Sequence, residues 1–528
     1  MTLATDDLPT DAEALRALLI AERADHAAER ARHAAALARI ESERDRLRAI
    51  IHALQRHRFG RRSERLDPDQ LALALEDVEQ SLASAEAEER TASPAQRARP
   101  AHRRKLNRGA LPRHLPRVET VVEVTEPVCP CCAGPMHKIG EDVSERLDVI
   151  PAQFRVLVAR RPKYACRSCP GTMIQAPAPP RLIEGGVPTE ALVAQVIVSK
   201  YADHVPLYRQ AQIYARQGIG LDRSTLADWV GRGAWWLRPL HARLLEHLRA
   251  APKLFADETT APVLDPGRGR TKTGQLWAYA RDDRPWAGPD PPAVAYVYAP
   301  DRKAERPAAH LVGFRGVLQV DGYAGYRALA EAGQVDLAFC WSHVRRQFYE
   351  IAARGPAPIA GEALTRIADL YAVEAEIKGQ SADARRAVRQ QKSKPLIDAM
   401  KTWLETQLAA VSQKSAIAAA IRYALARWTG LTRFIDDGRI EIDSNVVERT
   451  IRPLALNRKN ALFAGSDGGG EHWAILASLV ETCKLNAIDP QAYLADVFTR
   501  LVAGHPINRL DELLPWRWAD ARQPKRAA

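Results

Sequence analysis

The feature that most constrains the fold is a series of five short apolar runs between residues 253 and 340. Each run has the length and the apolar content of a β-strand. They cover residues 253–257, 275–281, 293–299, 316–321 and 335–340. The first three follow one another directly, the fourth comes after a short helical connection, and the fifth leads into a helix that begins near Trp341. The pattern predicts a sheet whose last strands alternate with helices.

The first and fourth runs both end in an acid, Asp257 and Asp321. The order of the runs is that of a ribonuclease-H-like sheet, in which the first and fourth strands are neighbours, so we expect these two acids to lie together. Two adjacent carboxylates repel each other unless a cation lies between them, which predicts a Mg²⁺ or Mn²⁺ site. Glu258 points to the opposite face of its strand, so only one of Asp257 and Glu258 can face the site.

A third acid is expected from a helix that begins near residue 444. Glu448 is the candidate, with Asn445 three residues earlier on the same helix face. Asp443 can cap this helix and is the alternative third acid. Three carboxylates around a pair of divalent metals would support an attack by water or a 3′-hydroxyl on a phosphodiester.

Two C-x-x-C knuckles predict a structural zinc ribbon. Cys129 and Cys132 form the first, and Cys166 and Cys169 form the second. Cys131 is interpreted as a spare thiol, and His137 is a poorer competing ligand. The segment between the knuckles alternates over residues 155–161 as a hairpin would.

A helix-turn-helix is predicted downstream of the ribbon. Residues 207–216 form a short amphipathic helix, Gly218 and Gly220 supply the turn, and Asp222 can cap the second helix. If the motif binds DNA, the start of its second helix lies against the duplex, with the contact residues Arg223, Ser224 and Thr225. An ordinary helical hairpin is the alternative.

The N-terminal segment at residues 10–58 contains neither Gly nor Pro and predicts a coiled-coil seam, with a single amphipathic helix as the alternative. The seam residues are Leu37, Ile40, Leu47, Ile51 and Leu54. Between residues 97 and 117 the chain is basic and has no acids, as in a linker that tracks a phosphate backbone or is simply solvated.

The overall charge agrees with a polyanionic partner. Lys plus Arg number 76 against 64 Asp plus Glu, a formal charge of +12. No apolar run approaches the ~18 residues of a membrane span. Acids at residues 6 and 7 replace the basic start of a signal peptide, so we expect a cytoplasmic, nucleoid-associated protein and no membrane partner.

Several motifs together resemble the transposases of the IS66 insertion-sequence family. They are Phe59 to Glu64, Asp257 to Thr259, Val320 to Tyr326, Cys340 to Arg346, Asn445 to Pro453 and Gly465 to Gly469. The resemblance covers nearly the whole chain. It implies an acid-triad (DDE) transposase in which Asp257, Asp321 and Glu448 are the catalytic carboxylates. It also implies a C-x-x-H element, Cys340 and His343, that supports the active site, with a helix start packed on the sheet as the alternative explanation of both residues.

The segment between the second and third acids is helical in pattern and predicts a lobe at about residues 350–437, inserted into the catalytic core. Beside Glu448, Arg449 is expected to support the site, as is Asn445. A basic cluster follows on the same segment and would hold the scissile DNA backbone, although Arg458 and Lys459 can equally be solvated. This cluster comprises Arg449, Arg452, Arg458 and Lys459.

The chain is therefore predicted to be a multidomain α+β protein. Its parts are a coiled-coil helix at 10–58, a basic linker and helical segment at 59–118, a zinc-binding ribbon at 119–180, a helix-turn-helix region at 181–250, a ribonuclease-H-like catalytic core at 251–480 and a C-terminal segment at 481–528.

The predicted function is that of a DNA transposase. It would bind the inverted ends of its own element, cut at the 3′ ends with a divalent metal and join those ends to target DNA. Two ends must react together, so a homodimer or larger synaptic assembly is expected, and the resemblance implies small accessory proteins. A domesticated, non-catalytic DNA-binding regulator and a metal-dependent nuclease without strand transfer are the alternatives.

Overall fold

The computed structural model describes residues 153–165, 173–265 and 270–522, together with Asp11, Arg117 and Glu119. The chain divides into two units, residues 1–157 and 158–528, and the account below concerns the second. The predicted coiled coil, the basic linker and the four zinc-knuckle cysteines lie outside the described residues. Among the residues that are described, no helix combines the length and the apolar character needed to cross a membrane.

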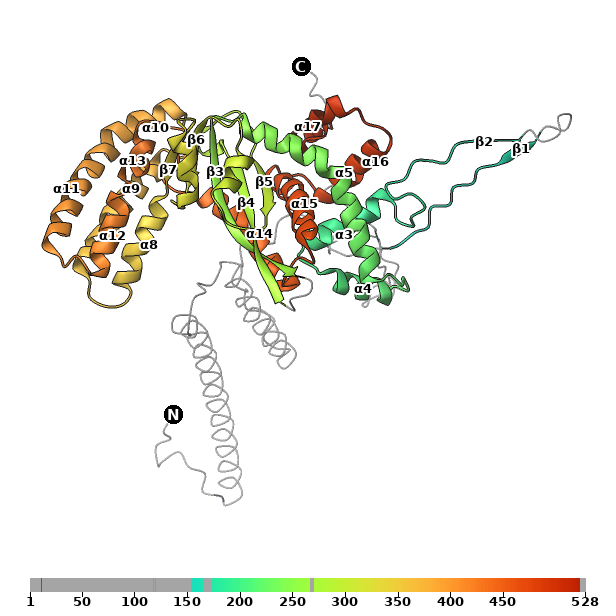
Figure 1. The fold of residues 1–528 in the computed structure, drawn as a ribbon, viewed down its shortest axis with the longest axis horizontal. Coiled ribbons are helices and arrows are strands. Elements are labelled where there is room, and N and C mark those ends of the chain that lie inside the picture. The colour runs from blue at the N-terminus through green and yellow to red at the C-terminus, as the bar shows by residue number, and fades with distance from the viewer. Residues whose placement is uncertain are drawn as a thin grey trace. The chain divides into compact units, whose positions relative to one another are not determined.

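A five-stranded mixed sheet forms the centre of the second unit (Figure 1). Its order is β5-β4-β3-β6-β7. The strands are β3 (Lys253–Asp265), β4 (Arg270–Arg281), β5 (Ala293–Ala299), β6 (Gly316–Val320) and β7 (Val335–Phe339). The first three form an antiparallel meander, and β6 and β7 continue the sheet in parallel with β3. The expected adjacency of the first and fourth strands is therefore present.

Strand β3 is longer than predicted, because the expected end at Asp257 is wrong. It continues to Asp265 and pairs with β4 over that extra length, from Thr259 opposite Leu276 to Asp265 opposite Arg270. Ala261 and Val263 are buried, so the far half of the hairpin has its own packed face. The polar residues at 257–260 led to the wrong prediction, because a polar stretch after an apolar run usually indicates the end of a strand.

The outer edge of β5 is covered by two helices, α15 (Asp467–Leu485) and α5 (Arg223–Arg249). Thr482 Oγ1 accepts the Val294 N–H at 3.1 Å and donates to the Val294 carbonyl at 3.0 Å. Ser478 Oγ accepts the Tyr296 N–H at 2.7 Å, and His241 Nε2 lies 2.9 Å from the Tyr296 carbonyl. Side chains thus satisfy the backbone groups of this edge strand.

The expected helix-turn-helix bounds are observed in α4 (Leu207–Arg216) and at the start of α5, with α3 (Glu190–Tyr201) before them. Gly218 has φ of 79°, the left-handed conformation that a turn here requires and that glycine adopts at little cost. Asp222 occupies the N-cap position of α5, but its carboxylate makes no capping hydrogen bond, contrary to prediction.

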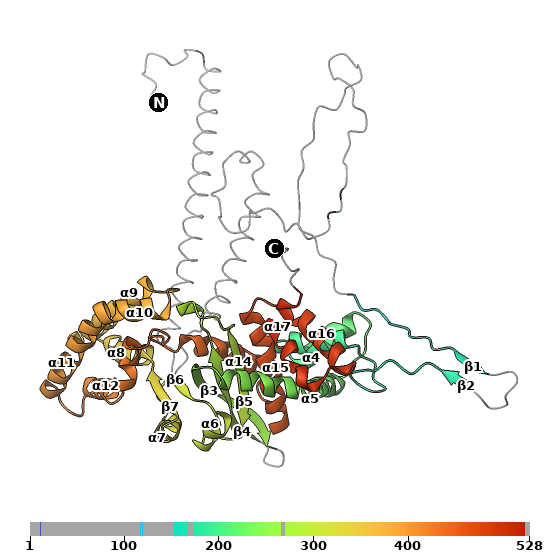
Figure 2. The ribbon, with the colours of Figure 1, turned by 90° about the horizontal axis from the view of Figure 1, so that it is seen from above.

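The helical insertion forms a lobe with its own core on the β7 side of the sheet, whereas α5, α15, α16 (Pro490–Val502) and α17 (Pro515–Asp520) lie on the β5 side (Figures 1 and 2). Its helices are α8 (Trp341–Ala352), α9 (Pro358–Glu376), α10 (Ala382–Val388), α11 (Lys394–Ala410), α12 (Ala416–Leu425) and α13 (Trp428–Thr432). Arg389, whose side chain is fully buried, donates to both Glu374 oxygens at 2.7 and 2.6 Å. Arg385 joins the same carboxylate to Glu441. This buried ion cluster ties the lobe to the segment before the third acid.

The C-terminal helices are α14 (Asn445–Ala461), α15, α16 (Pro490–Val502) and α17 (Pro515–Asp520). In the ribbon region, β1 (Lys163–Ala165) pairs antiparallel with β2 (Met173–Gln175). The strand predicted over residues 155–161 is wrong: this stretch has no regular structure. Val156, Leu157 and Val158 are exposed there, so no buried face stabilises a strand.

Candidate active site

Asp257 and Asp321 occupy matching positions on neighbouring parallel strands. The last registered pair between β3 and β6 is Phe255 opposite Gln319, and each aspartate follows its member of that pair by two residues. Residues two apart on a strand share a face. Asp257 therefore lies on the same face of β3 as Phe255. Asp321 comes directly after the end of β6 at Val320, where the pairing of β3 with β6 has stopped.

Gln319 anchors the segment that carries the third acid. Its side chain is fully buried and Nε2 donates to the carbonyls of Glu441 at 2.6 Å and Asp443 at 2.9 Å, while Oε1 accepts the Glu441 N–H at 3.3 Å. The backbone just before α14 is thus fixed to β6. Sequence analysis missed this residue, although a lone amide in an apolar strand, two residues before an acid, is a readable signal.

Glu448 lies in the first turn of α14, where the helix begins at Asn445. Its Oε1 accepts from Ser444 Oγ at 3.4 Å and lies 3.8 Å from Nδ1 of His343. Its side chain is 29% exposed, which leaves the carboxylate accessible from solvent.

The charges of the other two predicted acids act on Asp257, but among the described residues Asp257, Asp321 and Glu448 do not form a group whose oxygens all lie within 4.8 Å of one another. The pKa of Asp257 is raised to about 7, first because the carboxyl is buried and then because of the charges of Asp321, Glu258 and Glu448. Each of these carboxylates therefore acts on Asp257 across a short distance. Hard oxygen donors such as these carboxylates are of the type that Mg²⁺ and Mn²⁺ prefer.

Glu258 belongs to a different set of contacts. Arg302 forms an ion pair with its Oε1, and the Tyr326 hydroxyl donates to Oε2 at 3.3 Å. Burial raises the pKa of Glu258, and the Arg302 guanidinium opposes that shift. The neutralising partner agrees with the expectation that only one of the two consecutive acids faces the site.

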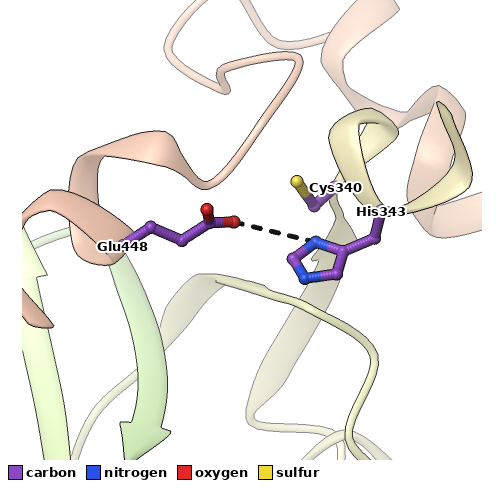
Figure 3. A group of neighbouring side chains, drawn as sticks. All are labelled: Cys340, His343 and Glu448. Carbon is purple, nitrogen blue, oxygen red and sulfur yellow. Dashed lines mark ion pairs between the residues drawn. The ribbon is translucent and has the colours of Figure 1, made fainter. Parts of the chain in front are cut away.

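The C-x-x-H element holds the start of α14 and faces Glu448 (Figure 3). Sγ of Cys340 accepts the Ser444 N–H at 3.2 Å and lies 2.9 Å from Ser342 Oγ, and the Trp341 N–H donates to the Ile442 carbonyl at 3.0 Å. Burial acts to raise the pKa of the Cys340 thiol, but the nearby imidazole of His343 and the hydrogen bonds from Ser342 and Ser444 lower it overall. The thiol, followed by Glu448, also raises the pKa of His343.

Asp443, the alternative third acid, is engaged elsewhere. The N-cap position of α14 is Ser444 and not Asp443 as predicted, and Asp443, one residue earlier, accepts the Asn445 N–H at Oδ1 at 3.1 Å and the Asn445 side-chain amide at Oδ2 at 2.7 Å. Burial raises its pKa, and the Asn445 N–H and the Tyr371 hydroxyl oppose that shift. Asn445 therefore stabilises the helix start, and its amide does not reach Glu448.

The predicted DNA-contact residues are spread over two places. Arg223 and Ser224 are exposed and Thr225 is half-buried at the start of α5. On α14, Arg449 and Lys459 are exposed and Arg452 is half-buried, whereas Arg458 donates to Thr260 Oγ1 on β3 at 2.6 Å. Arg458 is thus a link between helix and sheet.

Two further residues beside the acids were missed. The Tyr423 hydroxyl donates to the Asp321 carbonyl at 3.2 Å, and the Arg427 guanidinium lies over the Tyr423 ring, 3.8 Å from its centroid. Both come from α12 and the turn that follows it. These residues are far from Asp321 in sequence, so no local pattern could predict this contact.

Comparison with known proteins gives family matches along most of the chain. The model of the Transposase IS66 family matches residues 185–472, and that of the IS66 C-terminal element matches 478–516. The zinc-finger binding domain of transposase IS66 matches residues 126–170, and a model described as Transposase C of IS166 homeodomain matches 46–120.

Whole-length relatives agree with these matches. The chain is 45% identical to the uncharacterized protein y4jD of Sinorhizobium fredii, over 98% of each chain. It is also 45% identical to the uncharacterized protein y4qI of the same organism, over 98% of this chain and 99% of the relative. With more than half of its residues inside one family model, this chain belongs to the IS66 family of transposases.

Proposed function

We propose that the protein binds the inverted ends of its own mobile element, cuts DNA at the 3′ ends and joins those ends to target DNA. The observation that carries the proposal is that Asp257 and Asp321 each follow by two residues a registered pair of the neighbouring strands β3 and β6, while Gln319 of β6 holds the segment just before Glu448. Acids from two strands and a helix have no structural need to share one site, because their mutual repulsion destabilises the fold.

The strand order supports a ribonuclease-H-like core for this chemistry. Three antiparallel strands followed by two parallel ones, with β3 beside β6, is the arrangement expected of that fold. In this core Asp257 and Asp321 stand on adjacent strands, and Glu448 approaches from the helix that Gln319 fixes to β6.

A divalent metal fits the donor set. Asp257, Asp321 and Glu448 would hold Mg²⁺ or Mn²⁺, since both ions prefer carboxylate oxygen. When bound, such ions polarise phosphodiester oxygens and stabilise the charge that develops on them. The chain itself supplies the positioning: Cys340 holds the N–H of Ser444, and Asn445 with Asp443 stabilises the first turn of α14.

DNA contacts are assigned to two surfaces. Arg449, Arg452 and Lys459 lie three and seven residues apart on α14, which places them on one side of the helix, where they would hold the scissile backbone beside the acids. Arg223, Ser224 and Thr225 at the start of α5 would contact the element ends, because a helix N-terminus favours phosphate.

The remaining assignments concern assembly and location. Cys129, Cys132, Cys166 and Cys169 fall in or beside the zinc-finger match, and they would hold a structural Zn²⁺. The N-terminal helix would contribute to a homodimer or larger synaptic assembly in the cytoplasm, bound to the nucleoid. Small accessory proteins of the same element are further partners.

Strand transfer by the purified chain tests the proposal. The substrate is a duplex carrying the inverted repeats that flank the coding sequence, in one set intact and in the other precut at the 3′ end, with Mg²⁺ or Mn²⁺. Asp257→Asn, Asp321→Asn and Glu448→Gln should abolish cleavage and joining while end binding is retained. The control is Asp398→Asn, which changes an exposed acid on α11 whose ion-pair partner in the described part of the chain is Lys394.

The possible outcomes separate the alternatives. A nuclease would cleave intact ends but leave the precut end unjoined. A domesticated regulator would bind ends with no cleavage by the wild-type chain. Undiminished cleavage by Asp257→Asn would refute the assignment of the acids.

A further inference from the structure

Cys340, His343 and Glu448 form a second group of potential metal ligands, distinct in chemistry from the acid cluster. Sγ of Cys340, a ring nitrogen of His343 and a carboxylate oxygen of Glu448 all lie within 4.8 Å of one another. They come from the start of α8 and the first turn of α14, and Figure 3 shows the imidazole directed toward Glu448, with the sulfur near both.

The separations are close to those of an occupied site. Tetrahedral zinc with ordinary Zn–S, Zn–N and Zn–O bonds places neighbouring ligand atoms roughly 3.3 to 3.6 Å apart. The His343 Nδ1 to Glu448 Oε1 distance is 3.8 Å. Rotations about side-chain bonds are enough to close the remaining gaps, because both elements already contact each other through Cys340 and Ser444.

Nδ1 of His343 lies 3.8 Å from Glu448 Oε1, too far for a hydrogen bond. Nδ1 of His343 is buried and has no hydrogen-bond partner within the described part of the chain. A buried polar atom in that state costs free energy unless a proton, a water or a metal satisfies it. It faces the sulfur and the carboxylate oxygen, and both are metal donors.

The surroundings of the Cys340 thiol orient its sulfur as they would in a metal ligand. Sγ of Cys340 is buried, accepts the backbone N–H of Ser444 and lies 2.9 Å from Ser342 Oγ. Hydrogen bonds to a coordinating group are the usual second layer of a metal site, since they orient it and stabilise its charge. On metal binding the thiol would release its proton to solvent.

We propose that Cys340, His343 and Glu448 bind a thiophilic divalent ion of the zinc class, and that this ion competes with the hard cation for Glu448. Thiolate and imidazole select zinc over magnesium, whereas Asp257 and Asp321 offer only oxygen. Glu448 is the shared ligand, so occupancy of the soft site withdraws it from the acid cluster. The effect on DNA cleavage rests on the proposed function, but the binding itself does not.

Cobalt absorption measures the binding without any activity. Co²⁺ is titrated into the full-length protein with its cysteine knuckles already loaded with zinc, and the sulfur-to-cobalt charge-transfer and d–d bands are recorded. The wild type should show bands that Cys340→Ser removes and that His343→Ala weakens, with cobalt affinity lowered by about tenfold or more. Asp257→Asn should retain them.

A matched control separates the site from thiols in general. Cys483→Ala removes the other free cysteine in the described residues, a buried thiol within α15, and should leave the cobalt bands unchanged. Circular dichroism and thermal unfolding verify that each variant is folded. Identical cobalt spectra for wild type and Cys340→Ser, both folded, would overturn the proposal.

The cleavage assay tests the competition. Micromolar Zn²⁺ added at constant Mg²⁺ should inhibit the wild type, and Cys340→Ser should need at least about ten times more zinc for the same inhibition. Equal sensitivity of the two proteins would overturn the competition. If the wild type shows no cleavage at all, the proposed function fails, while the cobalt result still decides whether the site exists.

Discussion

Replacing Gln319 with leucine should detach the third acid from the sheet. The substitution removes three hydrogen bonds to the backbone of Glu441 and Asp443 while keeping a buried side chain of similar size. Each bond contributes about 1 kcal/mol net, and the carbonyls left unpaired add to the loss, so we expect a decrease of about 3 kcal/mol in unfolding free energy.

The effect on activity should exceed the effect on stability. The released segment leads into α14, and a displacement of Glu448 by about 1 Å can cost on the order of 10²-fold in rate. Cleavage of a duplex with the flanking repeats, measured at a temperature where both proteins are folded, gives the rate. Hydrogen exchange at residues 441–448 should increase in the variant, because these amides lose their anchor.

Gln275→Leu is the matched control for this prediction. Gln275 is a buried glutamine of β4 in the same sheet, and its side chain makes no hydrogen bond within the described residues. Its replacement should leave cleavage and the exchange at 441–448 near wild type. If Gln319→Leu cleaves as well as Gln275→Leu, Gln319 does not position the third acid.

Three further predictions concern the lobe, the sheet edge and the acid cluster. Arg389→Met leaves Glu374 buried beside Arg385 alone and should destabilise the protein by about 3 to 5 kcal/mol in chemical denaturation, a loss that Glu374→Gln in the same chain partly restores. Burial lowers the pKa of His241 to about 4 from 6.5, so its stabilising contribution is complete above about pH 6.5 and is lost as pH falls toward 4. The decrease in unfolding free energy should reach about 3 kcal/mol. The measurement is the denaturation midpoint as a function of pH, and an equally steep pH dependence in His241→Gln would contradict the prediction. Mg²⁺ should raise the melting temperature of the wild type and not of Asp321→Asn, and equal shifts in both would exclude Asp321 as a ligand.

Local patterns predicted much of the central sheet and little of its supporting contacts. The bounds of β5 and α4 agree with the expected runs, because each is a short apolar or amphipathic segment closed by turn residues. The acids Asp257 and Asp321 could be placed from strand order alone, since parallel neighbours bring equivalent positions together. Their catalytic role remains a prediction.

Contacts between distant segments could not be predicted from one sequence. Gln319 meets residues more than a hundred positions away, and Tyr423 reaches Asp321 from the inserted lobe. Strand β3 was underestimated because its polar centre interrupts the apolar pattern, although pairing with β4 continues through it. Tertiary pairing outweighed local propensity there.

The covering of β5 by Ser478, Thr482 and His241 limits how copies of this chain can associate. A peptide that adds to a sheet needs free amides and carbonyls along the outer strand, and here those of Val294 and Tyr296 are already occupied. Strand exchange between subunits is closed on this flank. Two copies that bring element ends together would therefore use surfaces other than the backbone of Val294 and Tyr296, whose outward groups α5 and α15 already occupy.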